Sequence, residues 1–115
     1  MKLRINGNSI RLRLNPNEVT NLCNEASITT HTTLLNGLLN YELKTGPHWH
    51  AEVLGSSISV SMPHTLIEDW AESKTVGFEH EFGNGLLVLV EKDFQCLHPR
   101  KHENEDHLYP NPENH

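Results

Sequence analysis

The chain has 115 residues, of which 21% are charged, and its formal net charge at pH 7 is −6. This length suffices for one domain with a hydrophobic core, and the acidic total excludes long-range attraction of nucleic acid by the chain as a whole. The sequence has no apolar run long enough to span a bilayer, no apolar signal segment at its start, and too few cysteines for a disulfide framework, so we expect a cytoplasmic protein with free thiols and no membrane partner.

Two short strands are predicted at the start of the chain. Apolar and polar residues alternate over residues 2–5 and again over residues 9–14, which is the pattern of half-buried strands. Asn6-Gly7-Asn8 favours a turn between them, so the two strands are expected to pair as a hairpin. Four basic side chains share the outward face of this hairpin: Lys2, Arg4, Arg11 and Arg13.

A helix is predicted to follow the first hairpin. Asn15-Pro16-Asn17-Glu18 has the spacing of a capping box, with proline at the first helical position. Val19, Leu22 and Cys23 then form one apolar stripe. Residues 27–35 are rich in threonine and favour a strand. Asn36-Gly37 predicts a hairpin turn before a returning strand over residues 38–45.

The same order of elements is predicted after Gly46-Pro47. Strands are expected over residues 49–54, 58–62, 75–82 and 86–92, with turns at Gly55-Ser56 and Asn84-Gly85. A second helix is expected from Pro63, with an apolar side formed by Leu66, Ile67, Trp70 and Ala71. The apolar run over residues 86–90 predicts a strand buried on both faces. Residues 94–115 are predicted to be a polar C-terminal tail.

An internal repeat supports this plan. Asn36-Gly37-Leu38-Leu39 recurs 48 positions later as Asn84-Gly85-Leu86-Leu87, and the ungapped alignment at that shift has eight identities in 41 pairs. Chance would give roughly two or three identities. We therefore predict an α+β fold in which two ββαββ repeats, residues 1–45 and 49–93, form one mostly antiparallel β-barrel with two short helices. Residues 1–93 would be a single domain.

Each repeat resembles the unit of AbrB- and MazE-type bacterial regulators. The residues that carry the resemblance are Gly7-Asn8-Ser9, Leu12-Arg13-Leu14-Asn15-Pro16, Asn36-Gly37-Leu38, Val60-Ser61-Met62-Pro63 and Asn84-Gly85-Leu86. The resemblance implies a swapped-hairpin barrel and DNA contacts from the basic hairpin face. In the second repeat, however, Glu52, Ser59 and Ser61 stand where the first has Arg4, Arg11 and Arg13. The alternative is a solvated face whose charges guard a strand edge.

The whole chain is also similar to a family of small bacterial proteins of unknown function. This similarity rests on Val90-Glu91-Lys92-Asp93-Phe94-x-Cys96-Leu97-x-Pro99-Arg100 and on the later Tyr109-Pro110-Asn111-Pro112. It implies no particular activity.

Two groups of residues have the chemistry of a transition-metal site. In His48-Trp49-His50 the two imidazoles would share one face of a strand, with a third ligand from His31, His80 or Glu52. The tail offers a second set that suits zinc or a similar ion: Cys96, His98, His102, Glu103, Asp106 and His107. The alternative interpretation is a set of exposed surface histidines and a polar tail.

No catalytic motif is present in the sequence. It has no phosphate-binding glycine loop and no nucleophile elbow, and Cys96 with His98 lacks an orienting residue and an oxyanion hole. We therefore predict an intracellular binding or interaction protein without catalytic activity, for which a protein partner or small ligand is favoured over DNA. The alternatives are a transition-metal-binding protein and a DNA-binding regulator or antitoxin of the AbrB or MazE type.

Overall fold

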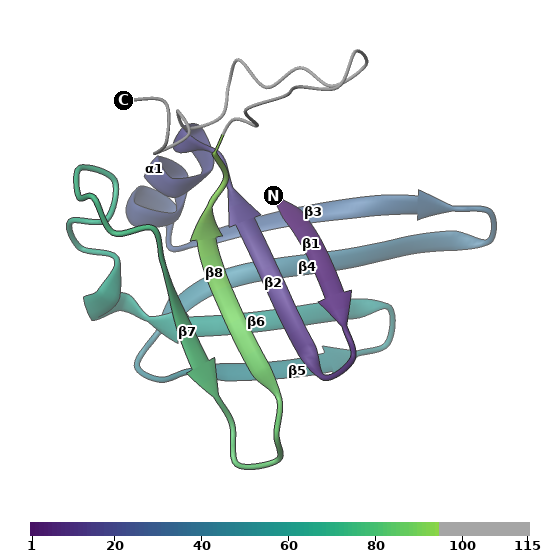
Figure 1. Ribbon diagram of the computed structural model, residues 1–115. Coiled ribbons are helices and arrows are strands. Elements are labelled where there is room, and N and C mark those ends of the chain that lie inside the picture. The colour runs from purple at the N-terminus through teal and green to yellow at the C-terminus, as the bar shows by residue number, and fades with distance from the viewer. Residues whose placement is uncertain (95–115) are drawn as a thin grey trace. The chain divides into compact units, whose positions relative to one another are not determined.

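The computed structural model describes residues 1–94 (Figure 1). This part of the chain is mostly β-strand and forms two compact units, each with its own four-stranded sheet. Of the described residues, the first unit contains 1–19 and 76–94, and the second contains 20–75.

Sheet A belongs to the first unit and has the strand order β1-β2-β8-β7. Its strands are β1 (Lys2–Asn6), β2 (Ser9–Leu14), β7 (Gly77–Glu81) and β8 (Leu87–Lys92). The β1–β2 and β7–β8 pairs are antiparallel hairpins, and the central β2–β8 pair is parallel. The first hairpin is therefore confirmed, and the last hairpin joins the same sheet.

One face of sheet A is apolar and buried. The register sets Leu12 beside Val90, and Leu14 and Val88 lie on the same face; all four side chains are buried. The prediction that residues 86–90 are buried on both faces is wrong. Leu87 and Leu89 are only half-buried, because they share the opposite face with the arginines of β2.

Sheet B belongs to the second unit and has the order β3-β4-β6-β5. Its strands are β3 (Ser27–Leu34), β4 (Gly37–Gly46), β5 (His50–Leu54) and β6 (Ser57–Pro63). The central β4–β6 pair is again parallel, between two antiparallel hairpins. The unit buries the side chains of Leu22, Tyr41, Leu43, Val60, Met62, Ile67 and Trp70.

The predicted closed barrel with two helices is wrong. Every strand pair in residues 1–94 lies within one of the two sheets, whereas a barrel needs pairing all the way round. Each sheet therefore keeps two edge strands, β1 and β7 in sheet A, and β3 and β5 in sheet B. Each sheet also takes one hairpin from before Gly46-Pro47 and one from after it.

The first hairpin of each half has the same register. Lys2 pairs with Arg13, and His50 pairs with Ser61, so both partners move by 48 positions. Gly7 and Gly55 occupy the same place in the two turns and have φ values of 57° and 58°, a conformation that suits glycine.

The predicted first helix is confirmed as α1 (Pro16–Glu25). Its capping box forms, because Asn15 Oδ1 accepts a hydrogen bond from the Glu18 N–H at 2.8 Å and Glu18 Oε1 accepts one from the Asn15 N–H at 2.9 Å. Val19 and Leu22 are buried, as the stripe predicted.

The second helix, predicted from Pro63, is reduced to a single 3-10 turn, η1 (His64–Leu66). At the 48-residue shift Pro63 replaces the capping Asn15, and Leu66 replaces Glu18. Pro63 makes no side-chain capping bond, so the first turn lacks the partners that its free N–H groups need. Leu66 is exposed, whereas Ile67 and Trp70 are buried as predicted.

Ala26, which follows α1, has the left-handed φ of 66°. Its N–H donates to the Leu22 carbonyl oxygen at 3.0 Å, as in a helix-ending turn that usually uses glycine. We expect Ala26→Gly to raise the free energy of unfolding by up to about 1 kcal/mol, because glycine adopts this φ without steric cost. Urea unfolding measures the change, and an unchanged or lower stability would contradict the expected strain.

Candidate interaction surface

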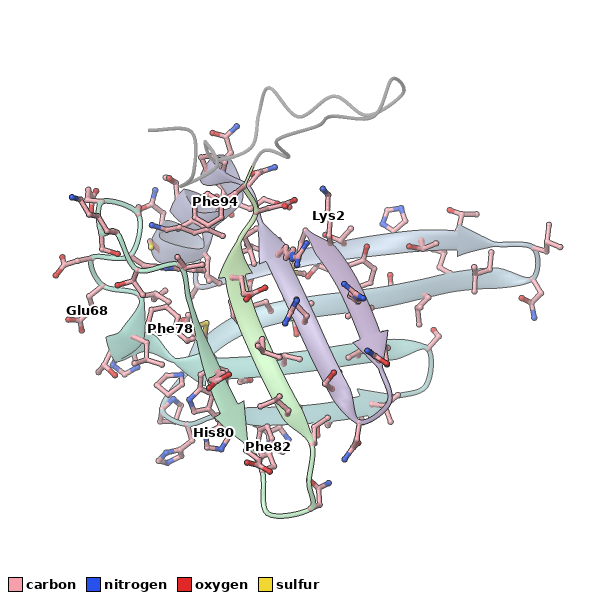
Figure 2. All side chains as sticks on the ribbon, in the orientation of Figure 1. Lys2, Glu68, Phe78, His80, Phe82 and Phe94 are labelled. Carbon is pink, nitrogen blue, oxygen red and sulfur yellow. The ribbon has the colours of Figure 1, made fainter. Side chains whose placement is uncertain are left out.

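The basic face predicted from the first hairpin does form in sheet A. Arg4 lies opposite Arg11, and Lys2 lies opposite Arg13, so the four side chains share one face of β1 and β2. Lys2 marks the start of edge strand β1 in Figure 2. Four cationic side chains on one face are what contacts with the phosphates of DNA would need on this hairpin.

Three of these four cationic side chains form salt bridges with carboxylates. Glu91 Oε1 lies 3.2 Å from Arg11 Nε and 3.5 Å from Arg13 Nε, and Asp93 Oδ2 lies 2.8 Å from Lys2 Nζ. Glu91 lies in β8 and Asp93 directly follows that strand, so both acids are far from the basic residues in sequence. They reduce the positive charge that a phosphate backbone would meet, so the geometry favours a guarded strand edge over a DNA-binding face.

Two charged residues at the end of the first unit's last strand are buried: Lys92, which ends β8, and Asp93, which follows it. The backbone N–H of Lys92 donates to the Val76 carbonyl oxygen, and that of Asp93 donates to the Leu14 carbonyl oxygen, both at 2.8 Å. Burial lowers the pKa of Lys92. Their backbone bonds tie the end of β8 into the first unit, which indicates a structural role.

The predicted histidine pair does not form a metal site in the part of the chain that the structure describes. His50 Nε2 lies 3.1 Å from Glu52 Oε2 on β5, but His48 precedes that strand. Within residues 1–94 no three or more His, Cys, Asp or Glu side chains are grouped to hold a metal ion. His80 instead packs edge-to-face against Phe82, with ring centroids 4.6 Å apart (Figure 2).

The second predicted metal set lies outside the described residues. It comprises Cys96, His98, His102, Glu103, Asp106 and His107. This set therefore stays a prediction.

Cys23 is a half-buried free thiol on α1. Its Sγ lies 3.2 Å from the Ile67 carbonyl oxygen, to which it donates. Burial raises the pKa of the Cys23 thiol, and Glu72 raises it further, against a hydrogen bond from the Ala71 backbone that lowers it. Since the thiolate is the nucleophile, a higher pKa leaves less reactive sulfur at neutral pH.

We expect Cys23 to react slowly with iodoacetamide. In a Cys96→Ser variant, the alkylation rate at pH 8 should be several-fold lower in the folded chain than in urea, and the pH at which the rate reaches half its maximum should be higher. Mass spectrometry of quenched samples measures both. Equal rates in the folded and unfolded chains would show that the thiol is not shielded.

A different surface stands out in sheet B, at the hairpin of β3 and β4. Its register runs from Ser27 paired with Lys44 to Leu34 paired with Gly37, whereas β4 meets β6 only from Asn40 onward. Residues 32–39, here called the arm, therefore lie beyond the first β4–β6 pair. Figure 1 shows this hairpin reaching farther than the β5–β6 hairpin beside it.

The arm ends in exposed leucines. The exposed fractions of Leu34, Leu35 and Leu38 are 52%, 109% and 47%. Leu34 and Leu38 belong to opposite faces of the hairpin, and Leu35 is in the turn. Apolar side chains concentrated at an exposed tip indicate a contact surface.

Strand β3 is also an edge strand without charge. The other edges carry charged side chains: Lys2 and Arg4 on β1, Glu52 on β5, and Glu79 and Glu81 on β7. Such charges usually keep a sheet edge from pairing with another chain. β3 has eight residues against five in each of the others, and His31 is its single titratable side chain. It is therefore the least protected edge in the described part of the molecule.

A shallow depression lies over the middle of sheet B, mostly on β4 and β6, with Thr29 as its one residue from β3. It has a volume of about 220 Å³ and is lined by Thr29, Asn40, Tyr41, Glu42, Ser57, Ile58 and Ser59. Ser59 Oγ donates to Glu42 Oε1 at 3.1 Å. The depression is smaller than the roughly 300 Å³ at which small-molecule sites begin, and its serine lies next to a carboxylate without an imidazole base. It thus suits a side chain of a partner better than a substrate.

Comparison with protein-family models matches residues 1–113 to the family described as "Family of unknown function (DUF7009)". The chain belongs to this DUF7009 family. No curated protein and no solved structure matches it, so the predicted resemblance to AbrB- and MazE-type regulators has no support from these comparisons.

The sequence of this DUF7009 chain does contain a signal for the unprotected edge. No Asp, Glu, Lys or Arg lies between Glu25 and Glu42. Its threonines carry no catalytic or metal-ligating chemistry, so by composition alone the stretch predicts only a strand. Separately, no helix in the described part of the DUF7009 chain is long and apolar enough to cross a membrane.

Proposed function

We propose that this DUF7009 chain is a non-catalytic interaction protein that binds an extended protein segment along β3 and over the leucines of the arm. The observation that carries the proposal is the exposed β3 edge, which has no charged side chain to keep another strand away. Alternate N–H and C=O groups of an edge strand point outward and are unpaired. A partner strand would satisfy them by extending the sheet.

The arm supports the choice of partner. Its exposed side chains are leucines, threonines and Asn36 in the turn, so a matching segment would be extended, uncharged and partly apolar. A highly charged segment would gain little from this surface, because it offers no charged side chain for an ion pair.

The two alternative functions have weaker support. For DNA binding, three of the four basic residues on the predicted face contact carboxylates. For metal binding, the remaining candidate ligands are Cys96, His98, His102 and His107, which lie outside the described residues. Zinc binding by these residues stays a prediction that elemental analysis of untagged protein would test.

The proposal is tested by capture of partners with matched variants. Leu35→Lys places a charge at the tip of the arm, and Leu54→Lys places the same charge at an exposed position near the tip of the neighbouring β5–β6 hairpin. Partners are cross-linked to each protein and identified by mass spectrometry. The wild type and Leu54→Lys should capture equal amounts of them. Leu35→Lys should capture at least about tenfold less, because an anchor residue of the interface is lost.

Circular dichroism confirms that both variants are folded. Equal capture of the same partners by all three proteins would contradict the proposed binding surface.

A further inference from the structure

We propose that the strand received by β3 is β3 of a second copy of this chain, paired antiparallel about a two-fold axis at His31. This inference rests on the proposed function and names the partner. It makes the chain a homodimer whose sheet B continues from one copy into the other.

The first support is a palindrome in the strand. Residues 28–34 are Ile-Thr-Thr-His-Thr-Thr-Leu, which is symmetric in residue type about His31 when Ile and Leu are counted as alike. In antiparallel pairing with His31 opposite its own copy, Thr30 meets Thr32, Thr29 meets Thr33, and Ile28 meets Leu34. Threonine pairs and apolar pairs directly across two strands both stabilise a sheet.

This register also keeps the faces of the sheet continuous. Positions paired in it differ by an even number, so both members of each pair lie on the same face of β3. Ile28 lies on the face of Leu43, with which it pairs in β4, and Leu43 is buried. The apolar face of sheet B would therefore run on into the partner copy, since Leu34 of that copy stands beside Ile28.

Repulsion between like charges favours β3 over the other edge strands as the contact between two copies. Each chain has a formal net charge of −6, so two copies repel each other through most of their surface. The stretch between Glu25 and Glu42 has no charged residue. Self-pairing of β7, by contrast, would bring Glu79 and Glu81 of the two copies together, which destabilises a sheet.

The test uses charge reversal at the axis. His31→Lys and His31→Glu each place a like charge opposite itself across the two-fold axis. In sedimentation velocity the wild type should show a concentration-dependent dimer, and each variant alone should need at least about tenfold more protein to dimerise, whereas an equimolar mixture of the two should dimerise again. Recovery in the mixture also shows that both variants are folded.

Val53→Lys is the matched control on the other edge of the same sheet, because Val53 is exposed on β5. It should dimerise as the wild type does. A wild type that stays monomeric over the accessible concentrations overturns the inference, and so does a mixture that fails to recover. If the wild type is monomeric but Leu35→Lys alone loses the partners that the wild type and Leu54→Lys capture, the proposed function stands and the extended partner is another protein.

Discussion

Trp70→Ala is expected to lower the free energy of unfolding by about 3–5 kcal/mol. The side chain is 1% exposed, and its Nε1–H donates to the Thr75 carbonyl oxygen at 2.8 Å. Truncation removes the largest fully buried side chain in the described residues and leaves a cavity in the second unit. Against a typical domain stability of about 5–15 kcal/mol, this change is severe.

The measurement is urea unfolding followed by circular dichroism. Glu68→Ala is the control, since Glu68 (labelled in Figure 2) is an exposed residue close to Trp70 in sequence and surface changes usually stay within about 0.5 kcal/mol. If the two variants lost equal stability, Trp70 would not be the core residue that the structure shows.

Gly77→Ala is expected to lower the free energy of unfolding by about 3 kcal/mol, because the site in β7 has no room for a methyl group. An added Cβ would lie 2.4 Å from the Val90 carbonyl oxygen and 2.9 Å from Glu91 Cα. Both are backbone atoms of β8, which pairs with β7, so the clash is relieved only by separating the strands. The same unfolding experiment measures the loss.

Gly83→Ala is the control for that change. A Cβ at Gly83 would have no atom within 4 Å, and its φ lies outside the left-handed region, so its effect should stay within about 0.5 kcal/mol. A Gly77→Ala protein as stable as the Gly83→Ala protein would show that β7 and β8 are not packed as described.

Local patterns were enough to predict the hairpins and the first helix. The alternation over residues 9–14 marks β2, and the Asn15 and Glu18 side chains mark the start of α1, because these signals act between residues close in sequence. The same logic explains the second helix that did not form. There the repeat preserved the spacing of the apolar residues but lost both capping side chains, with Pro63 and Leu66 in their places.

The closed barrel was wrong because strand periodicity does not identify a strand's partner. The parallel pairs β2–β8 and β4–β6 join segments from the two halves, and nothing in their alternation distinguishes two open sheets from one barrel. The same limit applies to the basic face. Its arginines were predicted correctly, but the carboxylate that meets Arg11 and Arg13 comes from Glu91 in β8.

The interaction surface was missed for a different reason. Functional sites are usually recognised in a sequence by nucleophiles, metal ligands or charges. Residues 26–41 matter because they contain no Asp, Glu, Lys or Arg. Only the strand order shows that β3 is an edge, and only the register shows that the arm extends beyond β6. Once β3 is known to be an edge strand, the symmetric threonines around His31 indicate that the strand can pair with a second copy of itself.

Hydrogen exchange of the wild-type chain at low and high concentration tests the central claim most directly. If β3 is the edge that receives a strand of a second copy, the amides of residues 27–34 should exchange more slowly at high concentration, while those of edge strand β5 should exchange at an unchanged rate. Exchange in β3 that is independent of concentration, or slowing that appears equally in β5, would contradict the account.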